Sequence, residues 1–119
     1  MKKENNKNEQ LKSLIRELKK TAIDNDVKIW KRLAVDLEKP SRQRRVVNVF
    51  KIEQYSKPNE IIVVPGKVLG TGVLSKKVDV AAYNFSDEAY KKISEKGSAI
   101  SITELMKKNP QGKKIRILG

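Results

Sequence analysis

The feature that most constrains the fold of this chain is an unbroken run of branched apolar residues at 61–64 (Ile-Ile-Val-Val), between Glu60 and Pro65-Gly66. Branched residues favour strands, and a strand that lacks polar residues at alternate positions is buried on both faces. The run therefore predicts a strand over residues 60–64 that is buried on both faces.

Two amphipathic helices are predicted ahead of this strand. Apolar residues recur at helical spacing over residues 9–22, and again over the segment from Trp30 to Leu37. The segment 24–26 (Asp-Asn-Asp) offers a break and a cap for the second helix, and Pro40 ends it. We expect the two helices to pack antiparallel. Because Trp30 lies on the apolar stripe, it is interpreted as a core anchor rather than a base-stacking platform.

Short strands and helices are expected to alternate after Pro40. A basic connector over residues 40–45 precedes a predicted strand at 46–50, and a glycine-rich stretch at 66–74 indicates turns or close backbone approaches. A strand at 78–85 leads into a helix that Ser86 caps and Gly97 ends. A strand at 98–102, a short helix capped by Thr103 and a strand at 114–118 follow. The predicted fold class is α/β, with two N-terminal helices ahead of an irregular body; residues 1–8 are expected to be a flexible basic N-terminus, and residues 9–119 a single domain.

The charge of the chain predicts a polyanionic partner. Its 27 Lys and Arg residues against 14 Asp and Glu residues give a net charge of +13, which repels itself in a compact body unless it is neutralised. Anionic lipid would favour one amphipathic helix with a basic face, whereas here the excess is spread over residues 1–20, 39–57 and 107–119. A nucleic acid that touches several faces fits this distribution better. No apolar run is long enough to span a membrane, and the first ten residues lack the apolar stretch of a signal peptide.

The composition of the chain lacks the residues on which several classes of enzyme and metal site depend. The chain has no cysteine and no histidine, which removes thiolate chemistry and the commonest general base and metal ligand. The glycine-rich stretch matches neither phosphate-binding motif: no Gly-Lys-Ser/Thr occurs, and Ser75 stands where the dinucleotide fingerprint needs glycine. Local ion pairs account for most acids. We expect no enzyme activity, no cofactor and no metal; a site built from Lys67 and Asp79 is the enzymatic alternative.

The pattern of residues narrows the type of nucleic-acid binding. A helix-turn-helix over residues 9–38 would present Asp24 and Asp26 to phosphates, and the scattered aromatic residues form no stacking platform on strands. The remaining mode is binding of a folded RNA by its shape and backbone, through Lys and Arg on loops and termini.

Six blocks of the sequence resemble the archaeal and eukaryotic "eighteen-e" family of large-subunit ribosomal proteins. They are residues 30–34 (Trp-Lys-Arg-Leu-Ala), 37–40 (Leu-Glu-Lys-Pro), 47–49 (Val-Asn-Val) with Ile52, 64–72 (Val-Pro-Gly-Lys-Val-Leu-Gly-Thr-Gly) with Leu74, 80–82 (Val-Ala-Ala) with Phe85-Ser86, and 109–112 (Asn-Pro-Gln-Gly) with Ile115-Arg116. The similarity covers residues 11–118 and points to the archaeal form. One departure is Ser98 after Gly97, where the family often has a second glycine.

The resemblance implies a structural, non-catalytic component of the large subunit in cytoplasmic ribosomes, which binds large-subunit rRNA and neighbouring ribosomal proteins. It also implies the irregular β-β-α superhelix that the family shares with the bacterial large-subunit protein "fifteen". The alternative is a free-standing nucleoid or RNA-chaperone protein. We expect Asn48 to contact the RNA backbone or a base edge. We expect ten cations to contact rRNA phosphates: Arg42, Arg44, Arg45, Lys51, Lys67, Lys76, Lys77, Lys113, Lys114 and Arg116.

Overall fold

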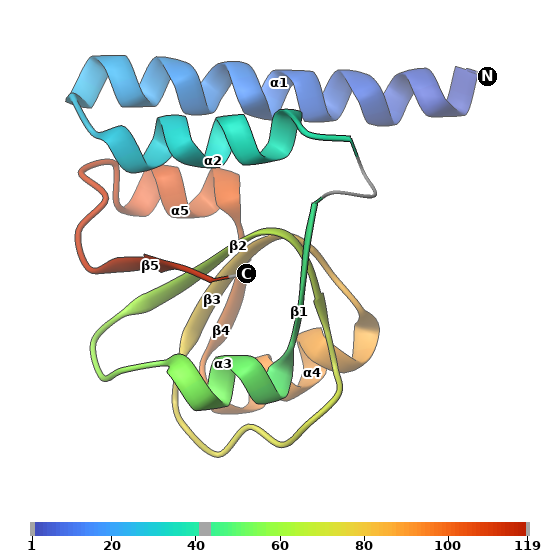
Figure 1. The fold of residues 1–119 in the computed structure, drawn as a ribbon, viewed down its shortest axis with the longest axis vertical. Coiled ribbons are helices and arrows are strands. Elements are labelled where there is room, and N and C mark those ends of the chain that lie inside the picture. Colours follow the sequence, from blue (N-terminus) through green and yellow to red (C-terminus); the bar gives the residue numbers. More distant parts are fainter. Residues whose placement is uncertain (1, 41–43, 119) are drawn as a thin grey trace.

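The computed structural model describes residues 2–40 and 44–118, with the backbone alone over residues 2–8. The described elements, in chain order, are α1 (Lys2–Asn25), α2 (Lys28–Glu38), β1 (Arg45–Asn48), α3 (Val49–Tyr55), β2 (Ile61–Leu69), β3 (Asp79–Phe85), α4 (Asp87–Lys96), β4 (Ser98–Ser101), α5 (Ile102–Lys108) and β5 (Ile115–Ile117). Two helices precede alternating strands and helices (Figure 1), which confirms the predicted α/β class. The domain boundary at residue 9 stays a prediction.

The sheet is built around β2. Four strands lie in the order β1-β2-β3-β4, every described pairing is parallel, and β5 also pairs with β2. Thus β5 pairs with the beginning of β2, where Ile61 lies opposite Ile115, and β1 pairs with its end, where Asn48 lies opposite Leu69. Pro65, which has no N–H to donate, lies between these two stretches. One edge of β2 is therefore shared by two strands that lie far apart in the sequence.

The predicted end of the central strand at Pro65-Gly66 was wrong, because β2 continues to Leu69. A bulge between Val64 and Lys67 accommodates Pro65 within the strand. At the next residue, Gly66, β1 approaches β2 closely. A Cβ atom placed on Gly66 would lie 1.9 Å from the carbonyl oxygen of Arg45, so only glycine fits there. The glycine-rich stretch thus contributes a close strand–strand approach as well as the loop that follows.

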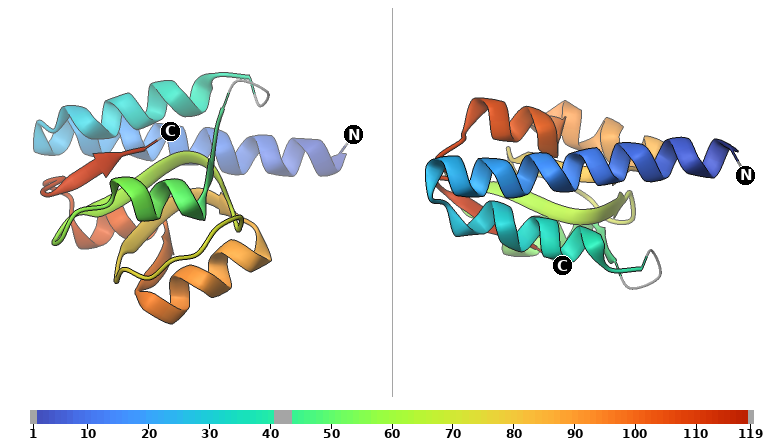
Figure 2. Two further views of the ribbon diagram at one scale, coloured as in Figure 1. Left: turned by 60° about the horizontal axis from the view of Figure 1, so that its bottom comes forward. Right: turned by 90° about the horizontal axis from the view of Figure 1, so that it is seen from above.

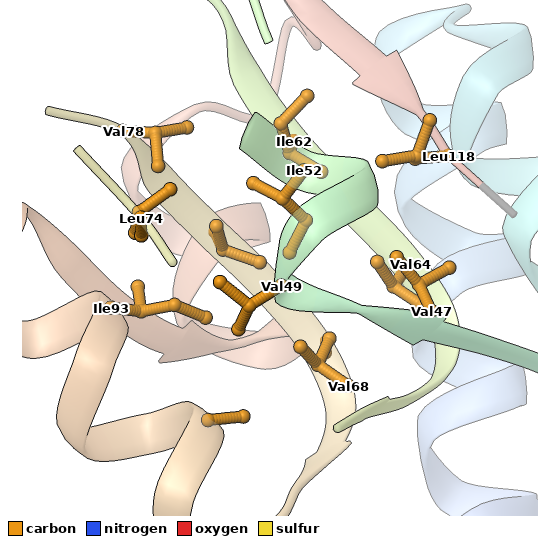
Figure 3. Packing of buried hydrophobic residues seen from close by; sticks show 13 residues of the cluster. Val47, Val49, Ile52, Ile62, Val64, Val68, Leu74, Val78, Ile93 and Leu118 are labelled. Atoms are coloured by element: carbon orange, nitrogen blue, oxygen red, sulfur yellow. The ribbon is translucent and has the colours of Figure 1, made fainter. Parts of the chain in front are cut away.

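Two hydrophobic cores lie on opposite faces of the sheet. Helices α1, α2 and α5 cover one face, and α3 and α4 cover the other (Figures 1 and 2). Successive residues of β2 alternate between the cores: Val63 packs under α2 and α5, while Ile62 and Val64 pack with Ile52 and Ile93 on the other face (Figure 3). All three β2 residues are fully buried. This confirms the double burial predicted from the apolar run.

Trp30 is the central side chain of the first core. It is fully buried between α1 and the sheet, and its indole Nε1 donates a 2.8 Å hydrogen bond to the carbonyl oxygen of Pro110. A buried indole needs such an acceptor, because an unpaired N–H in an apolar core is costly. The ring therefore ties α2 to the loop between α5 and β5, which confirms its interpretation as a core anchor.

The segment after Pro40 differs from the prediction at β1. Residues 46–50 were predicted as one strand, but β1 ends at Asn48 and the chain turns into helix α3, which the sequence did not reveal. Val49 and Ile52 lie three residues apart and are both fully buried in the second core. Tertiary packing of these two side chains outweighs the strand preference of the branched residues.

Two predicted helix caps were also wrong. The N-cap of α2 is Val27, with no side-chain cap, and Asp26 instead takes a left-handed conformation in the link from α1. The N-cap of α5 is Ser101 rather than Thr103, since Ser101 and Glu104 form a reciprocal capping box. Ser86 caps α4 as predicted, through Ala89 N–H. Gly97 ends α4 as predicted, and glycine is required there because a Cβ would lie 2.0 Å from the carbonyl oxygen of Val78.

Candidate nucleic-acid interface

A basic groove lies between α1 and the C-terminal half of α2. We call it the α1–α2 groove; it has a volume of about 390 Å³ and is lined by Leu11, Lys12, Ile15, Arg16, Lys19, Leu37, Glu38 and Arg44. Four of these residues are cations and one is an acid. The acid, Glu38, forms a 2.9 Å exposed ion pair with Lys19, whereas Lys12 and Arg16 form no ion pair with any side chain that the structure describes. The groove therefore combines apolar surface with unneutralised positive charge.

Arg44 joins this groove to the sheet. Its guanidinium carbon lies 5.8 Å from the centroid of the Tyr83 ring on β3, a distance at which a cation is attracted to the aromatic face. Its Nε is buried and, within the described part of the chain, has no hydrogen-bond partner. The contact with Tyr83 orients Arg44, which has no ion pair with a carboxylate among the described side chains. An arginine held in this way keeps its charge available for an anionic ligand.

A second group of predicted residues follows β1. Lys67 is exposed on β2, where it lies opposite Val46 of β1 and Asn84 of β3. Asn48 ends β1 and occupies the N-cap position of α3, but its side chain forms no capping hydrogen bond. Its Oδ1 is buried and has no hydrogen-bond donor among the described residues. Lys51 is half-buried in the first turn of α3. We call Arg44, Arg45, Asn48, Lys51 and Lys67 the β1 strip.

The remaining predicted cations lie at the amino ends of the strands. Lys77 and Lys114 line one hollow of about 560 Å³, together with Glu60 and Asp79. Lys113 is exposed beside them in sequence, and Lys76 donates a 3.2 Å hydrogen bond to the carbonyl oxygen of Ser56. The predicted residues therefore do not form one cluster: β1 carries one group, and the opposite end of β2 carries the other.

Arg116 differs from the other predicted cations because it already has a carboxylate partner. Its Nε donates a 2.8 Å hydrogen bond to Glu60 Oε1 across β5 and the start of β2. This bond raises the pKa of Arg116 and lowers the pKa of Glu60. Arg42 lies outside the described residues.

The loop between β2 and β3 is held by two charged residues that the sequence analysis did not single out. The Glu53 carboxylate of α3 accepts hydrogen bonds from Ser75 N (3.0 Å), from the Ser75 hydroxyl and from Lys76 N (3.2 Å). Lys92 of α4 donates to the carbonyl oxygens of Gly70 (2.6 Å) and Gly72 (2.7 Å). No spacing in the sequence connects these residues to the loop. Together they hold Lys76 and Lys77 in place.

We expect the effect of Glu53→Gln on stability to depend on pH. Hydrogen bonds from Ser75 lower the pKa of Glu53 below its usual 4.5, so the ionised form is favoured in the folded state. The contribution is then present above pH 4.5 and is lost as the pH falls through the lowered pKa. The variant should have a Tm a few degrees below wild type at pH 7, and the difference should shrink towards pH 3. Thermal unfolding followed by circular dichroism measures it, with exposed Glu95→Gln as the control; a difference that stays constant with pH would contradict this role.

The structure does not bring together the residues of the enzymatic alternative. Asp79 begins β3 opposite Ile61, and its carboxylate accepts a 2.8 Å hydrogen bond from the Ser98 hydroxyl. Lys67 lies opposite Asn84 near the other end of the same strand. Among the side chains of residues 9–40 and 44–118 there is no group of three or more acids placed to hold a metal ion, and no described helix has the length and apolar character to cross a bilayer.

Comparison with known proteins identifies relatives over nearly the whole chain. Residues 9–101 match the family described as ribosomal proteins 50S-L15 and 50S-L18e and their 60S counterpart. The large ribosomal subunit protein eL18 of Methanospirillum hungatei is 49% identical over 112 residues, covering 93% of each chain. The proteins of the same name from Archaeoglobus fulgidus and Haloarcula marismortui are 47% and 44% identical, covering 93% of this chain and 96% of theirs.

Proposed function

The chain belongs to the family of the ribosomal proteins 50S-L15 and 50S-L18e and their 60S counterpart, and on that premise we propose how it holds ribosomal RNA. It is a structural component of the large ribosomal subunit, and RNA binding is typical of its family. This confirms the family and the function predicted from the sequence. The family is not known for catalysis, and we propose no reaction for this chain.

We propose that the α1–α2 groove and the β1 strip form the main RNA-binding surface. The two are continuous, because Arg44 lines the groove and immediately precedes β1, and Lys67 lies across from the second residue of β1. The observation that carries the proposal is the groove itself, with four cations and one acid. Its lysines and arginines supply charge for phosphates, and its apolar lining can receive the face of an unstacked base.

The individual contacts follow from the chemistry of each side chain. Arg44, held over the Tyr83 ring, and Arg16 present planar guanidinium groups suited to a phosphate, while Lys12 and Lys67 act as point charges. Asn48, which is half-buried at the end of β1, offers its side-chain amide to the RNA backbone or to a base edge. Lys76, Lys77, Lys113 and Lys114 form a second, smaller contact region, where Glu60 neutralises Arg116. Neighbouring ribosomal proteins are further partners, and the site of action is the cytoplasm.

Sucrose-gradient sedimentation of a cell lysate tests this function against the free-standing nucleoid or RNA-chaperone alternative. We expect the chain to sediment with large subunits after a wash at moderate salt, because many phosphate contacts and protein neighbours hold it. Replacement of Lys12 and Arg16 with alanine should release it at lower salt than replacement of Lys91 and Lys96, two exposed cations of α4 that remove the same charge. Recovery of the wild-type chain at the top of the gradient would support the alternative.

A further inference from the structure

A second groove lies at the edge of the sheet, where β4 has β3 as its partner among the described strands. It has a volume of about 520 Å³ and opens between the carboxyl ends of β3 and β4 and the first turns of α4 and α5. We call it the β4 groove; its lining residues are Ala82, Tyr83, Asn84, Phe85, Asp87, Tyr90, Ala99, Ile100, Ser101 and Glu104.

The charge of the β4 groove is opposite to that of the chain. Its lining includes two acids, Asp87 and Glu104, and no lysine or arginine, although the chain carries a net charge of +13. The α1–α2 groove, in contrast, has four cations in its lining. Phosphates that the α1–α2 groove attracts are repelled by the two carboxylates of the β4 groove. The β4 groove is therefore poorly suited to RNA.

The aromatic residues of the groove favour a cationic ligand. Phe85 and Tyr90 meet edge to face, with ring centroids 6.1 Å apart and planes at 77°, and Tyr90 remains 53% exposed. Glu104 accepts a 3.3 Å hydrogen bond from Ser101 N through Oε1, so its capping role uses one carboxylate oxygen. Lysine and arginine bind well where an aromatic face and a carboxylate lie together, through cation–π attraction and charge-assisted hydrogen bonds.

We propose that the β4 groove binds an extended, lysine- or arginine-containing segment of a neighbouring large-subunit protein. The proposal rests on the ribosomal function above and adds a partner at a surface that adjoins the main RNA contact but is lined by acids instead of cations. The two surfaces adjoin at Tyr83, which lines the β4 groove and carries Arg44 above its ring. A basic segment seated in the groove would thus have ribosomal RNA on one side and the two acids on the other, both of which offset its charge.

Photo-crosslinking in assembled subunits tests the partner directly. Tyr90 is replaced by p-benzoylphenylalanine, large subunits that contain the substituted chain are purified and irradiated, and the adducts are identified by mass spectrometry. We expect an adduct between position 90 and a peptide of a second protein that contains lysine or arginine. The same probe at Tyr55, which is 47% exposed on α3, tests whether crosslinking is specific to the groove.

A charge-neutral variant tests the role of the acids. Asp87→Asn combined with Glu104→Gln should lower the yield of the position-90 adduct about five-fold or more, as expected for the loss of two partly exposed ion pairs. Glutamine preserves the capping box at Glu104, and Glu95→Gln is the matched control outside the groove. An adduct with ribosomal RNA, no adduct, or an unchanged yield in the double variant would overturn the proposal. Absence of the chain from large subunits would instead contradict the ribosomal function.

Discussion

Replacement of Arg44 and Arg45 with alanine is expected to weaken binding to large-subunit RNA about 100-fold at physiological salt. Each arginine is proposed to make a charge-assisted hydrogen bond to a phosphate, and such bonds contribute about 1.5 kcal/mol or more each. The dependence of binding on salt should also change, because two fewer counterions are released. The slope of log K against log[salt] should become shallower by roughly 1.5.

Filter binding or anisotropy with a large-subunit RNA fragment, over a series of salt concentrations, measures both effects. The matched control replaces Lys91 and Lys96 of α4, which removes the same charge from an exposed helix outside the proposed surface. Circular dichroism should show that both variants remain folded, since Arg44 and Arg45 lie at the start of an outer strand. An unchanged slope in the Arg44/Arg45 variant would exclude these residues from the phosphate contact.

Trp30→Ala is expected to destabilise the free protein by about 4 kcal/mol, which is a large part of the stability of a typical domain. The substitution empties the centre of the core beneath α1 and α2. It also leaves the carbonyl oxygen of Pro110 without its indole donor. For a chain of this size the Tm should fall by about 15 °C.

Trp30→Phe separates the two causes. It keeps an aromatic ring in the core but cannot donate to Pro110, so its Tm should lie between those of wild type and Trp30→Ala. Thermal unfolding by circular dichroism or calorimetry gives both values. A Trp30→Ala variant with nearly wild-type stability would mean that the core collapses around the vacated space, contrary to the close packing of α1, α2 and α5.

The predictable parts of the fold were those in which local pattern and tertiary packing agree. The buried strand at 61–64, the stripe of Trp30 and Leu37, and the cap at Ser86 all require nothing beyond neighbouring residues to be recognised. Helix α3 was not predicted, because the burial of Val49 and Ile52 depends on β2, β3 and α4. The continuation of β2 through Pro65-Gly66 was not predicted for a similar reason, because it depends on how closely β1 approaches Gly66.

The sequence predicted that the site is positively charged, but it predicted only some of the residues that form it. Arg44 was found because it stands in a basic run without acids, whereas Lys12 and Arg16 look like ordinary exposed helix residues until α1 packs beside α2. The ion pair of Arg116 with Glu60 joins residues 56 positions apart in the sequence, so no local pattern shows it. The assignment of individual RNA contacts stays a prediction, because charge alone does not say which cations face a phosphate.

The all-parallel sheet also affects how fast this protein can fold. No described strand pair is a hairpin, and the start of β2 pairs with β5 from the other end of the sheet's sequence, because Ile61 lies opposite Ile115. Such distant pairings make folding slow, so a newly synthesised chain remains an unfolded polycation for longer than a helical bundle would. Folding then brings the positive charges closer together, which costs electrostatic free energy, and nearby RNA can lower this cost by neutralising them. We therefore expect maturation of the fold to be faster on the nascent ribosomal particle than in free solution.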